Sequence, residues 1–297
     1  MTSDSPVDLT AFVKTYDVRG LVGSQLTPEV VEAFGAAFAD EIGSSAPEIV
    51  VGHDMRDSSP EFAAAFSRGV TARGTNVTLL GLCSTDETYF ASGSRNAPAA
   101  MFTASHNPAT YNGIKFSRAG AQGISLDTGL SSIRDRASAF LTDGVTAVDE
   151  SGEVTPFDAL PSYAAYLRSL VDLSAIRPIT IVVDAGNGMG GLTVPAVLGT
   201  AAGLPELPIE IIPSTSSSTA RSPTTRRTRS SPRTSSICRR PSSSTAPTSG
   251  SPSTATPTAA SWSTRRATPS RRPPSRPSSR FARSRASEPP RPRSTST

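Results

Sequence analysis

Residues 101–108 read Met-Phe-Thr-Ala-Ser-His-Asn-Pro, and residues 111–115 read Tyr-Asn-Gly-Ile-Lys. The apolar run Ala99–Phe102 predicts a short buried strand. This strand is expected to end in a polar loop, because Asn107-Pro108 is typical of a turn and proline disfavours helix in the residue before it.

The loop brings together side chains that suit phosphoryl transfer. We expect Ser105 to lie exposed at the strand end, with His106 beside it and Lys115 a short distance along the chain. A hydroxyl can carry a phosphoryl group, and nearby cations can offset the charge of that group.

The whole string T-A-S-H-N-P-x-x-Y-N-G-I-K closely resembles the active-serine loop of the α-D-phosphohexomutases, the family of phosphomannomutases and phosphoglucomutases. The resemblance implies that Ser105 is phosphorylated, passes its phosphoryl group to a mannose or glucose phosphate, and takes one back from the bisphosphate intermediate. It also implies that His106 and Lys115 assist proton transfer or hold the phosphate, and that Asn107 contributes to phosphate binding.

A second stretch, residues 11–20, reads A-F-V-K-T-Y-D-V-R-G and resembles the first motif of the same family, Y-D-I-R-G. The resemblance implies that Tyr16 and Arg19 line the site, where the planar fork of Arg19 would suit a phosphate. The simpler alternative is that Arg19 is a surface cation.

Strand and helix patterns alternate along the first part of the chain, which is typical of an α/β layer fold. The resemblance implies a mixed-sheet, three-layer domain I over residues 1–157, in which residues 142–157 are expected to be loop. The expected strands are Glu48–Val51, Asn76–Leu80, Ala99–Phe102 and Gly113–Ser117. The expected helices are Pro28–Ile42, Pro60–Arg73, a helix that begins near Glu87, and Asp127–Leu141. Thr27 is the expected N-cap of the first helix.

Residues 158–213 resemble the linker helix and the start of a second α/β domain in that family. The expected elements are a helix Asp158–Leu170, a strand Ile179–Val183, a helix Leu192–Leu198 and a strand Pro208–Ile212. An alternative is a dinucleotide-binding oxidoreductase, because Gly186, Gly188 and Gly191 fit G-x-G-x-x-G and Glu206 lies 20 residues beyond the first of them.

Charge divides the chain sharply at Ser214. Residues 214–297 contain seventeen arginines, no lysine and one acidic residue, Glu288, so this tail carries +16 while the preceding residues carry −12. The tail has no Leu, Val, Met or Tyr, and a segment of this composition is expected to be disordered. An arginine-rich nucleic-acid-binding arm, or nonspecific polyanion binding, is the alternative function for it.

A shifted reading frame after Pro213 is our hypothesis for this tail. Read one nucleotide earlier, the codons of residues 251–264 can encode L-A-F-D-G-D-A-D-R-C-F-V-V-D, which resembles the family's D-G-D-x-D-R metal loop. In that family the loop holds Mg²⁺ against the phosphoserine. The hypothesis implies that Ser105, through its phosphate, is the one metal ligand left, and that this chain is inactive.

Cysteine content and hydropathy indicate the compartment. The two cysteines, Cys83 and Cys238, are too few for a disulfide framework, which favours a reducing compartment. No apolar run approaches the ~20 residues that span a bilayer, and residues 1–8 do not resemble a signal peptide. A cytoplasmic protein is expected.

Overall fold

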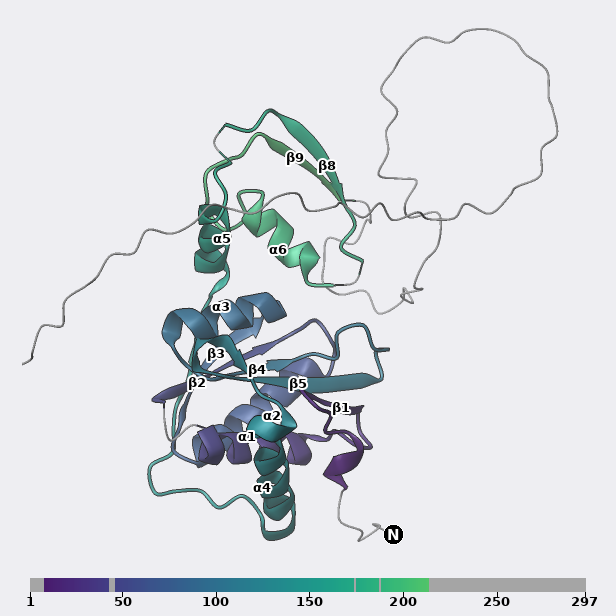
Figure 1. Cartoon of the computed structure of the whole chain (residues 1–297), viewed down its shortest axis with the longest axis vertical. Helices are drawn as coiled ribbons and strands as arrows, with labels where there is room; N and C mark the ends of the chain where they lie inside the picture. Colours follow the sequence, from purple (N-terminus) through teal and green to yellow (C-terminus); the bar gives the residue numbers. More distant parts are fainter. Residues whose placement is uncertain (1–7, 43–45, 174, 187, 214–297) are drawn as a thin grey trace, which may run out of the picture. The chain divides into compact units, whose positions relative to one another are not determined.

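The computed structural model describes residues 8–42, 46–173, 175–186 and 188–213 of the chain (Figure 1). The predictions made for residues 214–297, which concern disorder, polyanion binding and the shifted reading frame, lie outside the described residues.

A seven-stranded mixed sheet organises the first part of the chain. Its strand order is β1-β5-β4-β2-β3-β7, with β6 paired to β5. β2 runs parallel to β3 and β4, whereas β5 runs antiparallel to β4 and β1. The strands are β1 (Val18–Leu21), β2 (Glu48–His53), β3 (Asn76–Leu82), β4 (Ala99–Phe102), β5 (Tyr111–Arg118), β6 (Gln122–Gly123) and β7 (Val154–Pro156).

Helices cover both faces of this sheet. In Figure 1, α1, α2 and α4 lie on one side of the strands and α3 lies on the other. This arrangement confirms the expected α/β class with a mixed sheet and three layers. The helices are α1 (Pro28–Ile42), α2 (Ser59–Ala72), α3 (Thr85–Arg95) and α4 (Leu130–Asp143).

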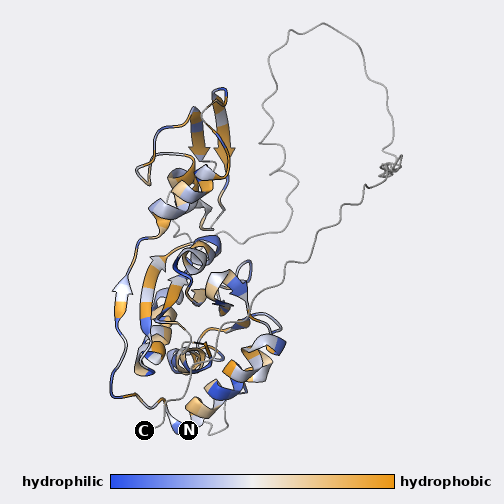
Figure 2. Cartoon of the chain, turned by 60° about the vertical axis from the view of Figure 1, so that its left-hand side comes forward, coloured by the Kyte–Doolittle hydropathy of each residue, from blue (hydrophilic) through white to orange (hydrophobic). Residues whose placement is uncertain are grey.

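The core follows from the alternation of side chains along the central strands. On β2, Ile49 and Val51 pack in the larger cluster with α1, α2 and α4, while Val50 packs in a smaller cluster on the α3 side. Because both faces are covered, β4 and residues 49–51 of β2 are apolar on both sides, and Figure 2 shows hydrophobic colouring along several strands. Five phenylalanine rings in contact fill the larger cluster: Phe34, Phe38, Phe66, Phe102 and Phe116.

The start of α1 agrees with the sequence prediction, whereas the start of α4 does not. α1 begins at Pro28, and the Thr27 hydroxyl accepts a hydrogen bond from the Val30 N–H at 3.4 Å. α4 begins at Leu130 rather than Asp127, because Gly129 has φ = 131° and separates α4 from the short 3₁₀ turn Leu126–Thr128.

The prediction that residues 142–157 are loop is wrong in part. Val154–Pro156 forms the edge strand β7, which pairs in parallel with Val77–Leu79 of β3. All three residues of β7 are exposed, so neither apolar alternation nor burial marks this strand in the sequence.

Residues 158–213 form the predicted elements within one or two residues of the expected bounds. β8 and β9 pair in parallel, and the Arg168 guanidinium donates hydrogen bonds to the carbonyls of Val197, Gly199 and Pro205. The elements are α5 (Leu160–Ser169), β8 (Ile179–Val183), α6 (Gly190–Val197) and β9 (Ile209–Pro213). Among the helices of the described residues, none has the length and apolarity needed to cross a membrane.

The contact between α1 and α2 depends on two glycines. A Cβ on Gly69 would clash with the Glu32 carbonyl, and a Cβ on Gly35 would clash with the Phe66 carbonyl. The two helix backbones therefore approach more closely than any side chain at these positions would permit.

We predict that Gly69→Ala lowers the free energy of unfolding by about 1–3 kcal/mol, because the added methyl group forces the helices apart. Gly93→Ala is the matched control: Gly93 is also helical but has nothing within 4 Å of its Cβ position. This control should be neutral or stabilising by up to about 1 kcal/mol. Urea unfolding of both variants measures the difference, and equal values would contradict the close-packing argument.

Candidate functional site

Ser105 lies exposed in the loop that follows β4, as the sequence predicts. Its N–H donates to the Thr103 hydroxyl at 2.9 Å, and the Asn107 N–H donates to the Ala104 carbonyl at 3.0 Å. His106 is exposed beside it, and 3.5 Å separates the Ser105 Oγ from the His106 Nδ1.

The backbone of Ser105 is strained. Its φ is 54°, in the left-handed region that a serine rarely adopts. Such a conformation costs about 1–3 kcal/mol and persists only where the surroundings enforce it, which happens most often at functional sites.

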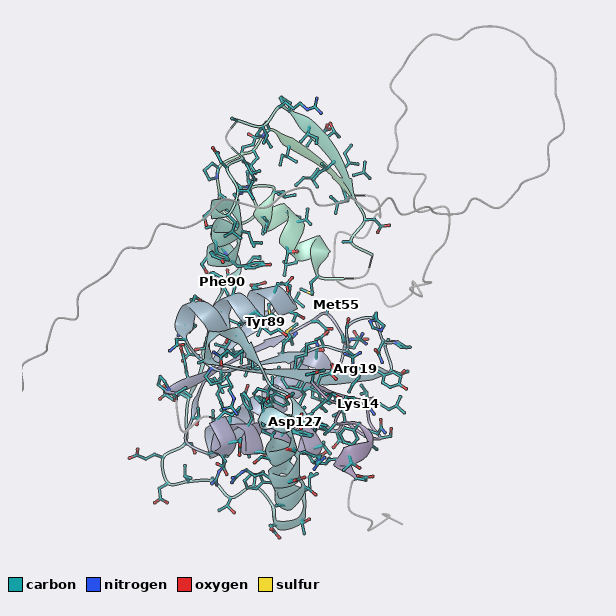
Figure 3. The ribbon with its side chains drawn as sticks, in the orientation of Figure 1. Lys14, Arg19, Met55, Tyr89, Phe90 and Asp127 are labelled. Carbon is teal, nitrogen blue, oxygen red and sulfur yellow. The ribbon has the colours of Figure 1, made fainter. Side chains whose placement is uncertain are left out.

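Two of the predicted cations, Arg19 and Lys115, lie near this loop and pair with the same carboxylate. Arg19 on β1 (labelled in Figure 3) donates to the Asn107 side-chain oxygen at 2.9 Å and forms an ion pair of 2.6 Å with Asp17. Lys115 on β5 lies 3.8 Å from the same Asp17 carboxylate. Asp17 thus holds both cations on one side of the serine loop, although we assigned it no role from the sequence.

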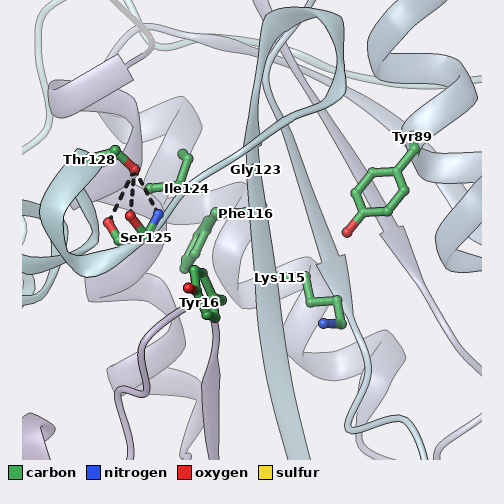
Figure 4. Close-up of a pocket in the computed structure, with 8 residues that line it drawn as sticks. All are labelled: Tyr16, Tyr89, Lys115, Phe116, Gly123, Ile124, Ser125 and Thr128. Carbon is green, nitrogen blue, oxygen red and sulfur yellow. Dashed lines mark hydrogen bonds between the residues drawn. The ribbon is translucent and has the colours of Figure 1, made fainter. Parts of the chain in front are cut away.

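Tyr16 lies next to this group but is not hydrogen-bonded to it in the described part of the chain. The residue is 71% exposed. Figure 4 shows Tyr16 in an open pocket of about 310 Å³, with Lys115 and Tyr89 on the other side of the β5 ribbon. Burial, with Asp86 and Asp17 nearby, raises the pKa of Tyr89 above its ordinary value, so its phenol keeps its proton at neutral pH.

Arg56 is the residue of this site that the sequence analysis missed. It lies in the loop after β2 and donates hydrogen bonds to four backbone carbonyls of the serine loop. A signal was present, since Gly52-His53-Asp54-Met55-Arg56 resembles the G-R-D-x-R loop of the phosphohexomutases and keeps its last arginine. His53 stands at the other arginine position, and its Nδ1 lies 2.9 Å from the Asp54 carbonyl.

Cys83 takes no part in the site. It is buried and free, and burial raises the pKa of its thiol to about 12. A thiol in this state is not a nucleophile at neutral pH.

The charge of the site suits a phosphate better than a metal. Three cations (Arg19, Arg56 and Lys115) and two carboxylates (Asp17 and Asp54) surround the loop, and both carboxylates are paired with arginine. Within residues 8–213 as described, no three His, Cys, Asp or Glu side chains form a group that could hold a metal ion. These residues therefore do not fit the Mg²⁺ that the family resemblance implies.

The three-layer sheet and its exposed serine loop define the class, an α/β/α domain of the phosphohexomutase type. A family model described as phosphoglucomutase/phosphomannomutase, alpha/beta/alpha domain I, matches residues 11–143. Residues 11–143 therefore match domain I of the phosphoglucomutase/phosphomannomutase family.

Relatives and a solved structure agree with this assignment. The chain is 38% identical over 205 residues to phosphohexose mutases of Xanthomonas campestris pv. campestris, which covers 69% of this chain and 43% of the relative. It is 35% identical over 188 residues to a phosphomannomutase of Vibrio cholerae, covering 62% of this chain and 40% of that protein.

A crystal structure of a phosphoglucomutase/phosphomannomutase family protein from Burkholderia thailandensis superposes with a TM-score of 0.58 at 29% identity, over 68% of this chain and 43% of that one. The chain thus spans less than half the length of each relative.

Of the three glycines of the oxidoreductase alternative, Gly186 and Gly188 lie between β8 and α6, and Gly191 lies in the first turn of α6. Gly186 has φ = 55°, which a glycine adopts without strain. Gly186 and Gly188 are also part of the string D-A-G-N-G-M-G, residues 184–190, which resembles the opening of the second domain of the phosphohexomutases. The relatives reported above are named phosphohexose mutases and phosphomannomutase.

A buried carboxyl group lies at the start of α3, near this site. The Ser84 hydroxyl accepts from the Glu87 N–H at 3.1 Å, and the Glu87 carboxylate accepts from the Ser84 N–H at 3.4 Å. Burial raises the pKa of Glu87 to about 7 from its ordinary 4.5, and the Asp158 carboxylate adds to this effect.

This pKa predicts how stability changes with pH. Between pH 4.5 and about 7 the folded chain holds a proton on Glu87 that the unfolded chain has lost, so the free energy of unfolding falls as pH rises through this window. Glu87→Gln keeps the cap and should flatten that fall. Urea unfolding at several pH values measures it, with Glu61→Gln on the exposed start of α2 as the control. Parallel curves for wild type and Glu87→Gln would contradict the assignment.

Proposed function

We propose that Ser105 is the phosphoryl carrier of a phosphomannomutase/phosphoglucomutase-type reaction that interconverts hexose 1-phosphates and 6-phosphates. The single observation that carries the proposal is the exposed, left-handed Ser105 in a loop with cations beside it. Support also comes from the relatives, which are named phosphohexose mutases and phosphomannomutase. We further propose domain I as residues 1–157 and the start of domain II as residues 158–213, in a cytoplasmic protein.

The proposed transfer needs no reactant besides phosphorylated Ser105 and the hexose phosphate. The bond from the Ser105 oxygen to phosphorus breaks as a bond forms to the free hydroxyl oxygen of the hexose phosphate, giving a hexose bisphosphate. The proton of that hydroxyl leaves and one returns to Ser105, and His106 is the nearest side chain to the Ser105 oxygen that can move it. Return of the other phosphoryl group to Ser105 then completes the isomerisation.

The cations have separate parts in this proposal. Arg19 and Lys115 would hold the phosphate through charge-assisted hydrogen bonds. Asn107, which accepts from Arg19 in the described structure, would keep that guanidinium over the loop. Tyr16 would line the approach of the sugar, where its exposed ring can pack against it.

We also propose that isomerisation by this chain is negligible. The described residues offer no cluster of metal-ligating side chains, and residues 214–297 contain a single carboxylate side chain. Without a divalent cation, the charge that develops on the transferred group is offset by side-chain cations alone.

Phosphorylation of Ser105 tests the carrier role directly. Incubation of the purified chain with a hexose 1,6-bisphosphate, with and without Mg²⁺, should give one phosphoserine, which peptide mass spectrometry would locate at Ser105. Ser105→Ala should give none if Ser105 is the carrier, and Ser125→Ala is the control, because Ser125 is a hydroxyl residue of the pocket that Lys115 also lines.

Two results would count against the proposal. Phosphate on another residue, or none in the wild-type chain, would contradict the carrier role of Ser105. Rapid conversion of glucose 1-phosphate to glucose 6-phosphate by this exact chain would contradict the predicted lack of isomerisation.

A shifted reading frame after Pro213 remains our proposal for the arginine-rich tail. It is motivated by the change of composition at Ser214, and the match to the Xanthomonas relatives leaves about a third of the chain uncovered. Sequencing the genomic DNA across the codons of Pro213 and Ser214 tests it. An additional base there should restore the D-G-D-A-D-R string, and DNA that encodes the chain as printed would contradict the shift.

A further inference from the structure

The strain at Ser105 requires something to enforce it. A serine has no special tolerance for the left-handed conformation that its φ of 54° represents. Ala104 is buried, but Ser105, His106 and Pro108 are exposed, so their side chains do not fix the shape of the loop by packing against the core.

The Arg56 guanidinium provides that constraint by binding four carbonyls of the loop. One terminal nitrogen, Nη2, donates to the carbonyl of Ser105 itself at 3.0 Å and to that of Asn107 at 2.8 Å. The other, Nη1, donates to the carbonyls of Pro108 at 2.9 Å and Tyr111 at 2.8 Å. The four bonds span the whole loop between β4 and β5.

Arg56 is itself held in place from the sheet. Only 9% of its side chain is exposed, and its Nε lies 3.3 Å from the Asp54 carboxylate. That carboxylate also accepts from the Arg56 N–H at 3.0 Å and from the Ser59 hydroxyl at 2.7 Å. The Asp54 N–H donates to the Phe102 carbonyl at 2.9 Å, which joins the end of β2 to the end of β4.

We propose that Arg56 is a positioning residue that holds Ser105 in the conformation required for phosphoryl transfer. The proposal rests on the carrier role proposed above for Ser105. Arg56 contacts backbone carbonyls and not the Ser105 hydroxyl, so it acts through the shape of the loop.

Lysine should not replace Arg56, although it keeps the charge. Its ammonium has three donors on one nitrogen, whereas the four carbonyls are divided between two nitrogens of a planar fork. A lysine at position 56 therefore cannot restore the loop by its charge alone. The Arg56→Lys variant thus distinguishes a positioning role from simple electrostatic attraction.

The test compares Arg56→Lys and Arg56→Met with wild type in the full chain. Arg168→Lys is the matched control, because Arg168 also donates to three carbonyls but lies in the segment after residue 157. The first readout is hydrogen exchange at the Asn107 and Tyr111 amides, which are bonded within the loop. The second is the rate of Ser105 phosphorylation by a hexose 1,6-bisphosphate.

Both Arg56 variants should exchange the two loop amides at least about tenfold faster than wild type while the amides of β2 stay protected. Both should lower the maximal rate of phosphorylation by about 10–100-fold, because a small displacement of a reacting group has effects of this size. The half-saturating bisphosphate concentration and the control variant should stay within about twofold of wild type.

Unchanged loop exchange in Arg56→Met, or full recovery of the rate in Arg56→Lys, would overturn the positioning role. If the wild-type chain is not phosphorylated at all, the carrier proposal fails, and the exchange experiment still decides whether Arg56 fixes the loop. Loss of protection throughout the sheet in both variants would show a role in folding, and that result also overturns the proposal.

Discussion

The ion pair between Arg56 and Asp54 is the contact on which the shape of the site depends. Asp54 follows β2 directly and is tied to β4 through the Phe102 carbonyl. Arg56 extends from it to four carbonyls of a loop that is otherwise exposed. Because β2 and β4 lie at the centre of the sheet, the Arg56 guanidinium connects the loop to the end of a central strand.

The cations of the site therefore differ in what they can do. Arg56 has its donors directed to backbone carbonyls, whereas Arg19 and Lys115 share the Asp17 carboxylate at the open side of the loop. An incoming phosphate would compete with Asp17 for these two cations. The site has more cations than carboxylates, which favours a phosphate dianion, and within the described residues it offers no metal-ligating cluster.

Much of the fold follows from sequence patterns, because the central strands are apolar on both faces and helices with recognisable starts separate them. β7 was missed since an exposed three-residue edge strand has no apolar pattern, and the start of α4 was misplaced because the break at Gly129 depends on its φ of 131°. Two motifs predicted the site residues: the serine string gave Ser105, His106, Asn107 and Lys115, and the first motif gave Tyr16 and Arg19. Arg56 lies in a third string that departs from the family's loop at His53, and its contact with residues 105–111 forms only after β2 and β4 have paired.

The backbone conformation of Ser105 in the wild-type chain is the measurement that tests the account most directly. Backbone chemical shifts and couplings of Ser105 in solution report its φ. The account predicts a single conformation with φ near 54° and one set of resonances for the loop. An extended Ser105, or a loop that averages over several conformations, would contradict the claim that Arg56 and Asp54 hold the serine in place.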